Sequence, residues 1–155
     1  MFKKIKYFLL ITLLFLPLSF QKISAEELDK DQRETVNIYF FWGKGCPHCA
    51  DEKPFLEKLA KKYPQVEIKS YEVWGSKKNR ELLKEFGERL NTNVSGVPFT
   101  VVGEEYVSGW LNEEYTGKKI EEMVICHLNK GCQDIGEKIL GTTTESTNNK
   151  EKETK

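Results

Sequence analysis

The alternation of apolar and polar residues along the middle of the chain predicts four strands. Residues 35–42 (TVNIYFFW) are nearly continuously apolar and rich in β-branched and aromatic side chains, as in a strand buried on both faces. Residues 66–73 (VEIKSYEV) alternate with a period of two, which is typical of a half-buried strand. Residues 97–102 and 105–109 form a predicted hairpin around a glycine-containing turn.

Between and after these strands, apolar residues recur every three or four positions, which predicts three helices. The first covers residues 47–63, because Pro64 cannot continue the helix. The second begins after Ser76, a residue that favours a helix N-cap, and the third follows the hairpin. The predicted inward faces are Phe55, Leu56, Leu59, Ala60 and Tyr63, then Leu82, Leu83, Phe86 and Leu90, and last Ile120, Met123, Val124 and Leu128.

The order of these elements, β-α-β-α-β-β-α, predicts a single α/β domain over residues 35–140. A strand–helix–strand unit implies a parallel pair of strands, and the hairpin adds an antiparallel edge. We therefore expect a mixed four-stranded sheet with helices on both faces. A chain of 155 residues suits one such domain, because two would each have a small core.

The two ends of the chain differ from the domain in composition. Residues 1–25 contain a basic stretch, an apolar run of roughly a dozen residues and a small-residue ending at Ala25, the layout of a secretory signal peptide. An uncleaved membrane anchor is the alternative. Residues 26–34 form a charged lead-in, and residues 141–155 lack apolar side chains, which predicts a disordered tail. We expect an extracytoplasmic location, in the periplasm or at the cell exterior, where disulfides persist.

Charge excludes one class of function. The chain holds 24 basic and 24 acidic residues, but residues 1–25 contribute four lysines and no acid. The rest of the chain therefore carries 20 basic and 24 acidic residues, a net charge of −4, without a cluster of Lys and Arg. Such a chain has no electrostatic basis for binding nucleic acid.

The sequence Cys46-Pro47-His48-Cys49 stands where the first strand gives way to the first helix. Free N–H groups and the dipole at a helix N-terminus stabilise a thiolate. We therefore expect Cys46 to be the nucleophile and Cys49 to close a redox-active disulfide with it. Pro47 suits the first helical turn. His48 should lower the pKa of Cys46 and make the disulfide more oxidising.

Three other uses of a CxxC sequence compete with redox chemistry. Haem attachment requires His directly after the second Cys, where this chain has Ala50. Zinc would need a second pair of ligands, and the spacing of Cys126, His127 and Cys132 fits no closed zinc module. A purely structural disulfide across two residues would add little to a core of this size. We therefore expect redox chemistry, with no metal and no cofactor.

Several separated features resemble the thioredoxin-like thiol–disulfide oxidoreductases, over nearly all of residues 35–128. Phe41-Trp42 stands just before the CxxC, as the family's aromatic pair does, and we expect Trp42 to belong to the active-site surface. Pro54 matches the proline that kinks the family's active-site helix. The resemblance implies a thioredoxin fold, with protein thiols and disulfides as substrates.

A second part of the resemblance concerns substrate binding. Gly96-Val97-Pro98 matches the cis-proline loop, which packs beside the CxxC in the family and binds the substrate backbone. Gly109 resembles a glycine of the same surface. The resemblance therefore implies that the Val97–Pro98 bond is cis and that Gly96, Val97, Pro98 and Gly109 bind substrate.

Two departures from the family pattern limit the inference. Cys-Pro-His-Cys is the active-site sequence of DsbA-type oxidases, but only 48 residues separate Cys49 from Pro98, which leaves no room for their helical insertion. The family also often keeps a buried acid six residues before the nucleophile, where this chain has Phe40. Glu67 and Lys69 on the neighbouring strand are candidates to replace that acid.

The second pair of cysteines, Cys126 and Cys132, brackets Gly131 at the end of the last helix. Gly at this position favours a helix C-terminus. In an exported protein we expect a structural disulfide between these two cysteines, with a redox relay as the alternative. His127 falls on the apolar stripe of the helix and is interpreted as a partly buried structural residue.

The resulting hypothesis is an exported thiol–disulfide oxidoreductase on the oxidising side, acting as a monomer with a membrane redox partner protein. Two alternatives stay open at this point. One is an extracytoplasmic reductase that receives electrons from a membrane thiol carrier. The other is a non-catalytic module that holds a metal ion on its thiolates.

Overall fold

The computed structural model describes residues 35–141. The predicted signal peptide, the charged lead-in and the predicted tail beyond Gly141 lie outside the described residues. Within residues 35–141, no helix is both long enough and apolar enough to cross a lipid bilayer. In chain order the elements are β1 (Val36–Trp42), α3 (Pro47–Lys62), β2 (Val66–Glu72), α4 (Lys77–Arg89), β3 (Phe99–Val102), β4 (Glu105–Ser108), the π-helical turn η2 (Glu113–Gly117) and α5 (Lys118–Lys130).

The four strands form one sheet in the order β2-β1-β3-β4. β1 pairs in parallel with β2, whereas the β1–β3 and β3–β4 pairs are antiparallel. The nearly continuous apolar run of β1 fills a central position, and six of its seven residues are buried. The alternating sequence of β2 lies at an edge. The expected mixed four-stranded sheet is confirmed.

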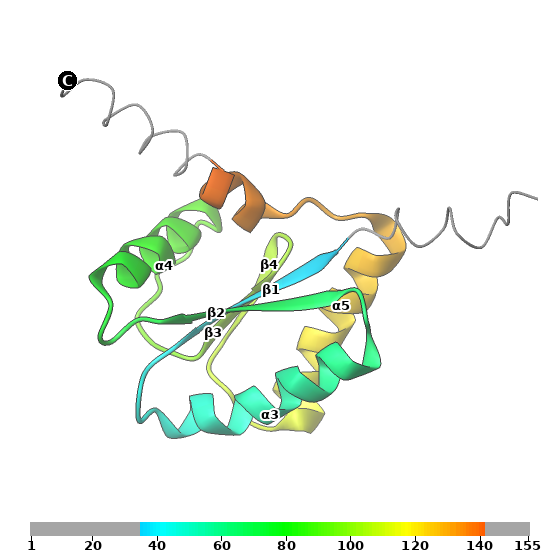
Figure 1. The fold of residues 1–155 in the computed structure, drawn as a ribbon, viewed down its shortest axis with the longest axis horizontal. Helices are drawn as coiled ribbons and strands as arrows, with labels where there is room; N and C mark the ends of the chain where they lie inside the picture. Colours follow the sequence, from blue (N-terminus) through cyan, green and yellow to red (C-terminus); the bar gives the residue numbers. More distant parts are fainter. Residues whose placement is uncertain (1–34, 142–155) are drawn as a thin grey trace, which may run out of the picture. The chain divides into compact units, whose positions relative to one another are not determined.

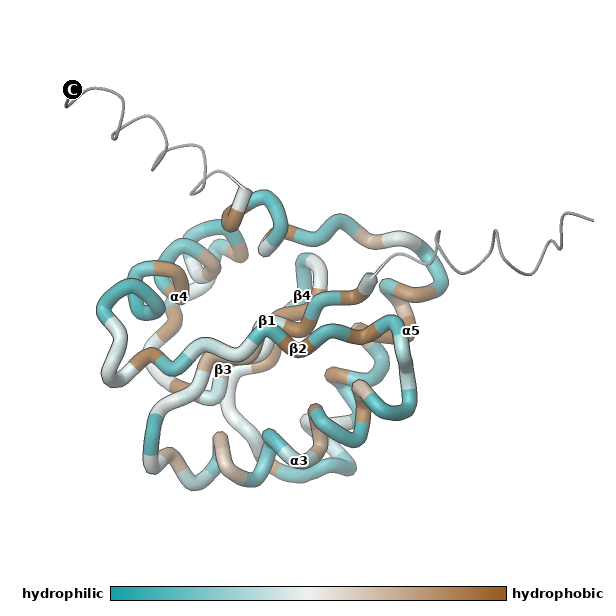
Figure 2. Tube along the Cα trace, in the orientation of Figure 1, coloured by the Kyte–Doolittle hydropathy of each residue, from teal (hydrophilic) through white to brown (hydrophobic). Residues whose placement is uncertain are grey.

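Helices cover both faces of the sheet because successive residues of β1 point to opposite sides. Ile38 and Phe40 pack with buried residues of α3 and α5, whereas Tyr39 and Phe41 pack with those of α4. Accordingly, α3 and α5 lie on one side of the sheet and α4 on the other (Figure 1). Figure 2 shows apolar residues concentrated along the strands and polar residues along the outer sides of the helices.

The segment that follows α5 crosses to the α4 side of the sheet, an arrangement that the sequence analysis did not predict. α5 ends at Gly131, whose backbone is left-handed (φ 60°), as expected for a glycine C-terminal to a helix. Residues 135–141 are helical and bury Ile135 and Ile139 in the cluster that includes α4 residues. The side chain of Asp134 caps this helix by accepting hydrogen bonds from two of its N–H groups.

Candidate active site

The turn from β1 to α3 carries the two cysteines of the CxxC sequence. Cys46 is the N-cap of α3, with an extended backbone (φ −73°, ψ 116°), and Pro47 follows in the first turn. The N–H of Cys49 donates a hydrogen bond to Sγ of Cys46 over 3.1 Å. Negative charge on this sulfur is therefore stabilised by a direct donor and by the positive end of the helix dipole.

Cys46 and Cys49 are joined by a disulfide, with their Cα atoms 5.3 Å apart. Both are buried, Cys46 with 7% of its surface exposed and Cys49 with 3%. Pro47 and His48 between them are exposed. The predicted pair is therefore assembled, and the influence of His48 on Cys46 stays a prediction.

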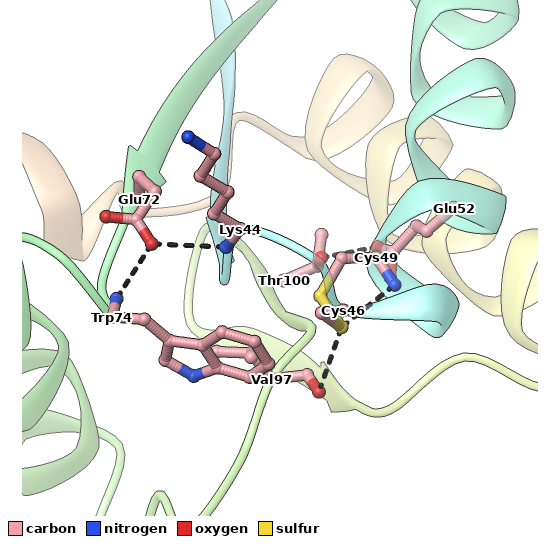
Figure 3. The surroundings of a disulfide bond; sticks show 8 residues. All are labelled: Lys44, Cys46, Cys49, Glu52, Glu72, Trp74, Val97 and Thr100. Carbon is pink, nitrogen blue, oxygen red and sulfur yellow. Dashed lines mark hydrogen bonds between the residues drawn. A yellow bond between two sulfur atoms is a disulfide. The ribbon is translucent and has the colours of Figure 1, made fainter.

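The loop before β3 lies against the disulfide. Its Val97–Pro98 peptide bond is cis, as the resemblance implied. The carbonyl oxygen of Val97 lies 3.8 Å from Sγ of Cys46 (Figure 3). A disulfide sulfur has no proton to donate, so in the oxidised protein this approach is a contact and not a hydrogen bond.

Gly109 belongs to the same surface as the proline loop. Its N–H donates a hydrogen bond to the carbonyl oxygen of Pro98 over 2.7 Å, and its backbone has a positive φ of 82°. A side chain other than hydrogen would be strained at this φ. The structure thus brings Val97, Pro98 and Gly109 together near Cys46, and substrate binding by these residues and Gly96 stays a prediction.

Trp42 ends β1 and is half-buried beside the disulfide. It lines a pocket of about 290 Å³ together with Phe40, Cys46 and Cys49. A pocket of this size is large enough to admit water. Both cysteines therefore border a space that water can occupy.

Trp74 follows β2, and 56% of its surface is exposed. Its indole ring lies against Gly43, where an added Cβ would overlap the ring. Trp74 and Val97 also line a groove of about 790 Å³ that includes residues of α4. An exposed aromatic ring therefore borders the same groove as the proline loop, a position that strand periodicity gave no means to predict.

Glu72 ties the loop of Trp74 to the turn that carries the CxxC (Figure 3). Its carboxylate accepts hydrogen bonds from the N–H groups of Trp74 (2.9 Å), Gly75 (2.8 Å) and Lys44 (3.2 Å). These backbone donors, that of Gly75 foremost, hold the pKa of Glu72 below its usual value. Lys44 belongs to the turn before Cys46, so one side chain orders both loops.

The expectation that Glu67 or Lys69 replaces the family's buried acid is wrong. In the register of β1 and β2, Glu67 pairs with Asn37 and Lys69 with Tyr39. Side chains of paired residues share a face of the sheet, and Tyr39 packs on the α4 side. The Lys69 ammonium lies 5.7 Å from the centre of the Tyr39 ring. Glu67 and Lys69 therefore point away from the face that carries the disulfide.

The buried acid on the disulfide side is Glu52, one helical turn after Cys49. It has no exposed surface, and its Oε1 accepts a hydrogen bond from the Thr100 hydroxyl over 2.5 Å, while Oε2 has no partner. Burial raises the pKa of Glu52 to about 7, against the opposing effect of the Thr100 hydrogen bond. The available sequence signal was its place on the apolar stripe of α3, three residues after Cys49 and four before Leu56.

Cys126 and Cys132 lie close together at the end of α5. Their Sγ atoms are 3.8 Å apart and are not bonded in this structure. Burial, followed by the proximity of Cys126, raises the pKa of the Cys132 thiol. The structural disulfide therefore stays a prediction, with both partners already adjacent. His127 is buried, with 6% of its surface exposed, and its structural role stays a prediction.

A metal site is the alternative to redox chemistry for the cysteines. In the part of the chain that the structure describes, no three His, Cys, Asp or Glu side chains are grouped so that they could hold a metal ion.

No protein-family model matches the sequence, and no curated protein matches it significantly. Solved structures do match. A protein of Agrobacterium tumefaciens is similar with a TM-score of 0.52 and 20% identity, over 64% of this chain and 48% of that protein. This chain therefore spans about half of the length of that protein.

Two further structures are similar with lower scores. A thioredoxin variant of Halobacterium salinarum has a TM-score of 0.45 and 27% identity, over 63% of this chain and 83% of its own. The catalytic domain of Proteus mirabilis ScsC has a TM-score of 0.45 and 17% identity, over 64% of this chain and 86% of that domain.

The strand order and the placement of the helices agree with the fold that the resemblance implied. The chain has a thioredoxin-like α/β fold in which Cys46 and Cys49 form a disulfide at the start of a helix.

Proposed function

We propose that this chain is an exported thiol–disulfide oxidoreductase that acts on protein substrates, on the oxidising side. The observation that carries the proposal is the Cys46–Cys49 disulfide at the N-terminus of α3, where the N–H of Cys49 donates to Sγ of Cys46. A sulfur that is stabilised as a thiolate is a good leaving group and favours the reduced form of the pair. The disulfide is then a competent oxidant.

The reaction proceeds by two thiolate attacks. A substrate thiolate attacks Sγ of Cys46, the Cys46–Cys49 bond breaks, and Cys49 leaves with the electron pair. A second substrate thiolate then attacks the substrate sulfur of the mixed disulfide. The substrate gains a disulfide, and Cys46 and Cys49 are left reduced. The carbonyl of Val97, 3.8 Å from Sγ of Cys46, is available to an N–H of an extended substrate segment.

The test of exchange is the oxidation of a reduced dithiol peptide, with insulin reduction as the opposite assay. We expect Cys46→Ser to abolish activity in both. A matched control, Cys126→Ser with Cys132→Ser, should keep the activity. Full activity of Cys46→Ser in either assay would contradict the proposal.

The oxidising direction needs its own test, because a reductase fed by a membrane thiol carrier is the second candidate. The observation that favours this candidate is the short connection from α3 to β3, which contains β2 and α4 and no helical insertion. A redox titration against glutathione separates the two. We expect a potential higher than that of thioredoxin, about −270 mV, and a potential as low as this value would favour the reductase.

Export is proposed from the composition of residues 1–25. Fractionation of cells that produce the full chain, followed by N-terminal sequencing, tests it. We expect extracytoplasmic protein that begins near Glu26. Protein found with the cytoplasm and beginning at Met1 would overturn this part of the proposal.

A further inference from the structure

We propose that Glu52 is the group that exchanges a proton with the Cys49 sulfur during disulfide exchange, an inference that rests on the proposed function. The family acid is absent from β1, where Phe40 stands in its place. In this chain the carboxyl group comes from the helix that carries the disulfide.

The sheet register shows that Glu52 reaches the layer where a strand-borne acid would lie. Phe40 of β1 pairs with Thr100 of β3, so their side chains share a face of the sheet. Phe40 packs in the same cluster as Cys49, which identifies this face as the one under α3. The Thr100 hydroxyl donates to Glu52 Oε1 over 2.5 Å. Glu52 therefore spans from α3 to the position beside Phe40.

The helix places Glu52 and Cys49 together. Residues three apart lie on the same side of a helix, and both residues are buried. Figure 3 shows the two side chains on adjacent turns of α3, with the Glu52 carboxyl turned toward Thr100. Because Thr100 occupies Oε1, Oε2 is left without a partner. A buried carboxyl oxygen without a partner is free to exchange a proton with a neighbouring sulfur, directly or through one water.

Few titratable groups lie near Glu52 on the face of the sheet that α3 covers. The strands contribute the apolar Ile38, Ile68 and Val107 and the neutral Thr100. They also contribute two carboxylates to this face, because Glu72 of β2 pairs with Trp42 and Glu105 of β4 pairs with Val102. α3 itself adds the exposed Lys53, which lines the pocket beside Cys49. From α5 the buried titratable side chain is His127, which lines a separate pocket with Thr35, at the other end of β1.

The proton balance runs in both directions of exchange. When a substrate thiolate breaks the Cys46–Cys49 bond, Cys49 leaves as a thiolate and takes a proton from the Glu52 carboxyl. In the reverse reaction, the Glu52 carboxylate takes the proton from the Cys49 thiol. The Cys49 thiolate then attacks Sγ of Cys46, and the substrate sulfur leaves as a thiolate. Burial raises the pKa of Glu52 to about 7, so the side chain can hold or release this proton near neutral pH.

The test is a stopped-flow reaction of the reduced full-length chain with the chromogenic disulfide 5,5′-dithiobis(2-nitrobenzoate), in a Cys126→Ser, Cys132→Ser background. Attack by Cys46 releases the first chromophore in a concentration-dependent phase, and attack by Cys49 releases the second in a concentration-independent phase. We expect Glu52→Gln to slow the second phase at least about tenfold at pH 7, since proton transfer by a positioned side chain contributes about 10²–10⁴. The first phase should keep its rate.

The controls separate this role from a structural one. Glu57→Gln, at an exposed site on the same helix, should leave both phases unchanged. Glu52→Asp keeps a carboxyl group and should restore part of the second-phase rate and its pH dependence. Equal second-phase rates and pH profiles in the parent protein and Glu52→Gln would overturn the inference. Loss of the first phase in the parent protein would instead contradict the proposed function.

Discussion

Individual side chains make the two sulfurs of the disulfide unequal. Sγ of Cys46 receives the N–H of Cys49 at the start of α3, 3.1 Å away. Cys49 is more deeply buried and is followed one turn later by the buried carboxyl of Glu52. Charge on Cys46 is thus stabilised by the backbone, whereas charge on Cys49 has a proton source beside it. This asymmetry is what an attacking and a resolving cysteine require.

The buried carboxyl of Glu52 should make stability depend on pH. Its pKa is raised to about 7 in the folded, oxidised protein, above the value of 4.5 that it would have when unfolded. Between these values the folded state holds the extra proton, so stability falls as pH rises from 4.5 through 7. The loss approaches about 3 kcal/mol at pH 8, at 1.36 kcal/mol per pKa unit.

Glu52→Gln should remove this dependence, because its amide stays neutral. Urea unfolding of the oxidised proteins should show nearly equal stability at pH 5 and a more stable Glu52→Gln protein at pH 8. The account is wrong on this point if the two proteins lose stability in parallel over that range.

His48 tests how the residues between the cysteines set the potential. Its side chain is exposed beside the N-terminus of α3, where an imidazole can stabilise the Cys46 thiolate. We expect His48→Gly to make the couple more reducing by about 30 mV or more, a tenfold change in the equilibrium constant. Equilibration with glutathione measures it. Lys61→Ala, in the last turn of the same helix, is the control and should not change the potential.

At this scale, the sequence predicted the chemistry that depends on local spacing. Cys46 and Cys49 were assigned because a strand ends and a helix begins at these positions. Glu52 could not be assigned in the same way, because its role depends on burial against Thr100, 48 residues away. Glu67 and Lys69 were wrong candidates because the face to which they point follows from the β1–β2 register.

Among the elements, the helical segment 135–141 is the one that the apolar pattern missed. Ile135 and Ile139 are its only buried apolar side chains, too few to establish a helical period. Gly136 interrupts the pattern for a packing reason, since an added Cβ there would overlap the Tyr39 ring. In contrast, α3 and α4 were predicted because each repeats its apolar positions over several turns.

We expect this segment to contribute substantially to stability. Ile139 is completely buried, and Ile139→Ala should lower the free energy of unfolding by about 2–4 kcal/mol. Lys119→Ala, at an exposed position of α5, should change it by no more than about 0.5 kcal/mol. Equal unfolding midpoints for the two variants in urea would show that the segment does not pack on the domain in solution.

The predicted disulfide between Cys126 and Cys132, at the end of α5, can be tested by its effect on stability. If Cys126 and Cys132 form the predicted structural disulfide, replacing both by serine should lower the free energy of unfolding by about 2 kcal/mol. Disulfide exchange should continue, because the pair is not part of the proposed exchange site. Mass spectrometry of the oxidised protein after alkylation should show no free thiol. Two alkylated cysteines would refute the disulfide.

Taken as a whole, the domain is organised by β1, which separates the two apolar clusters and leads directly into Cys46. The face under α3 and α5 contains the disulfide and Glu52, and the α4 side brings Trp74 to a groove that Val97 also lines. The order of elements and the mixed sheet followed from periodicity. Contacts between distant segments, such as Trp74 against Gly43, could not be predicted from periodicity, because they depend on three-dimensional packing.

The central claim is that Cys46 attacks and Cys49 resolves. Its most direct test is to trap the mixed disulfide with a peptide that contains a single disulfide. In the reduced full chain with Cys49→Ser, we expect a stable adduct that peptide mapping places on Cys46. With Cys46→Ser, the buried Cys49 should form no adduct on the same timescale. Equal trapping by the two variants, or an adduct on neither, would contradict this account.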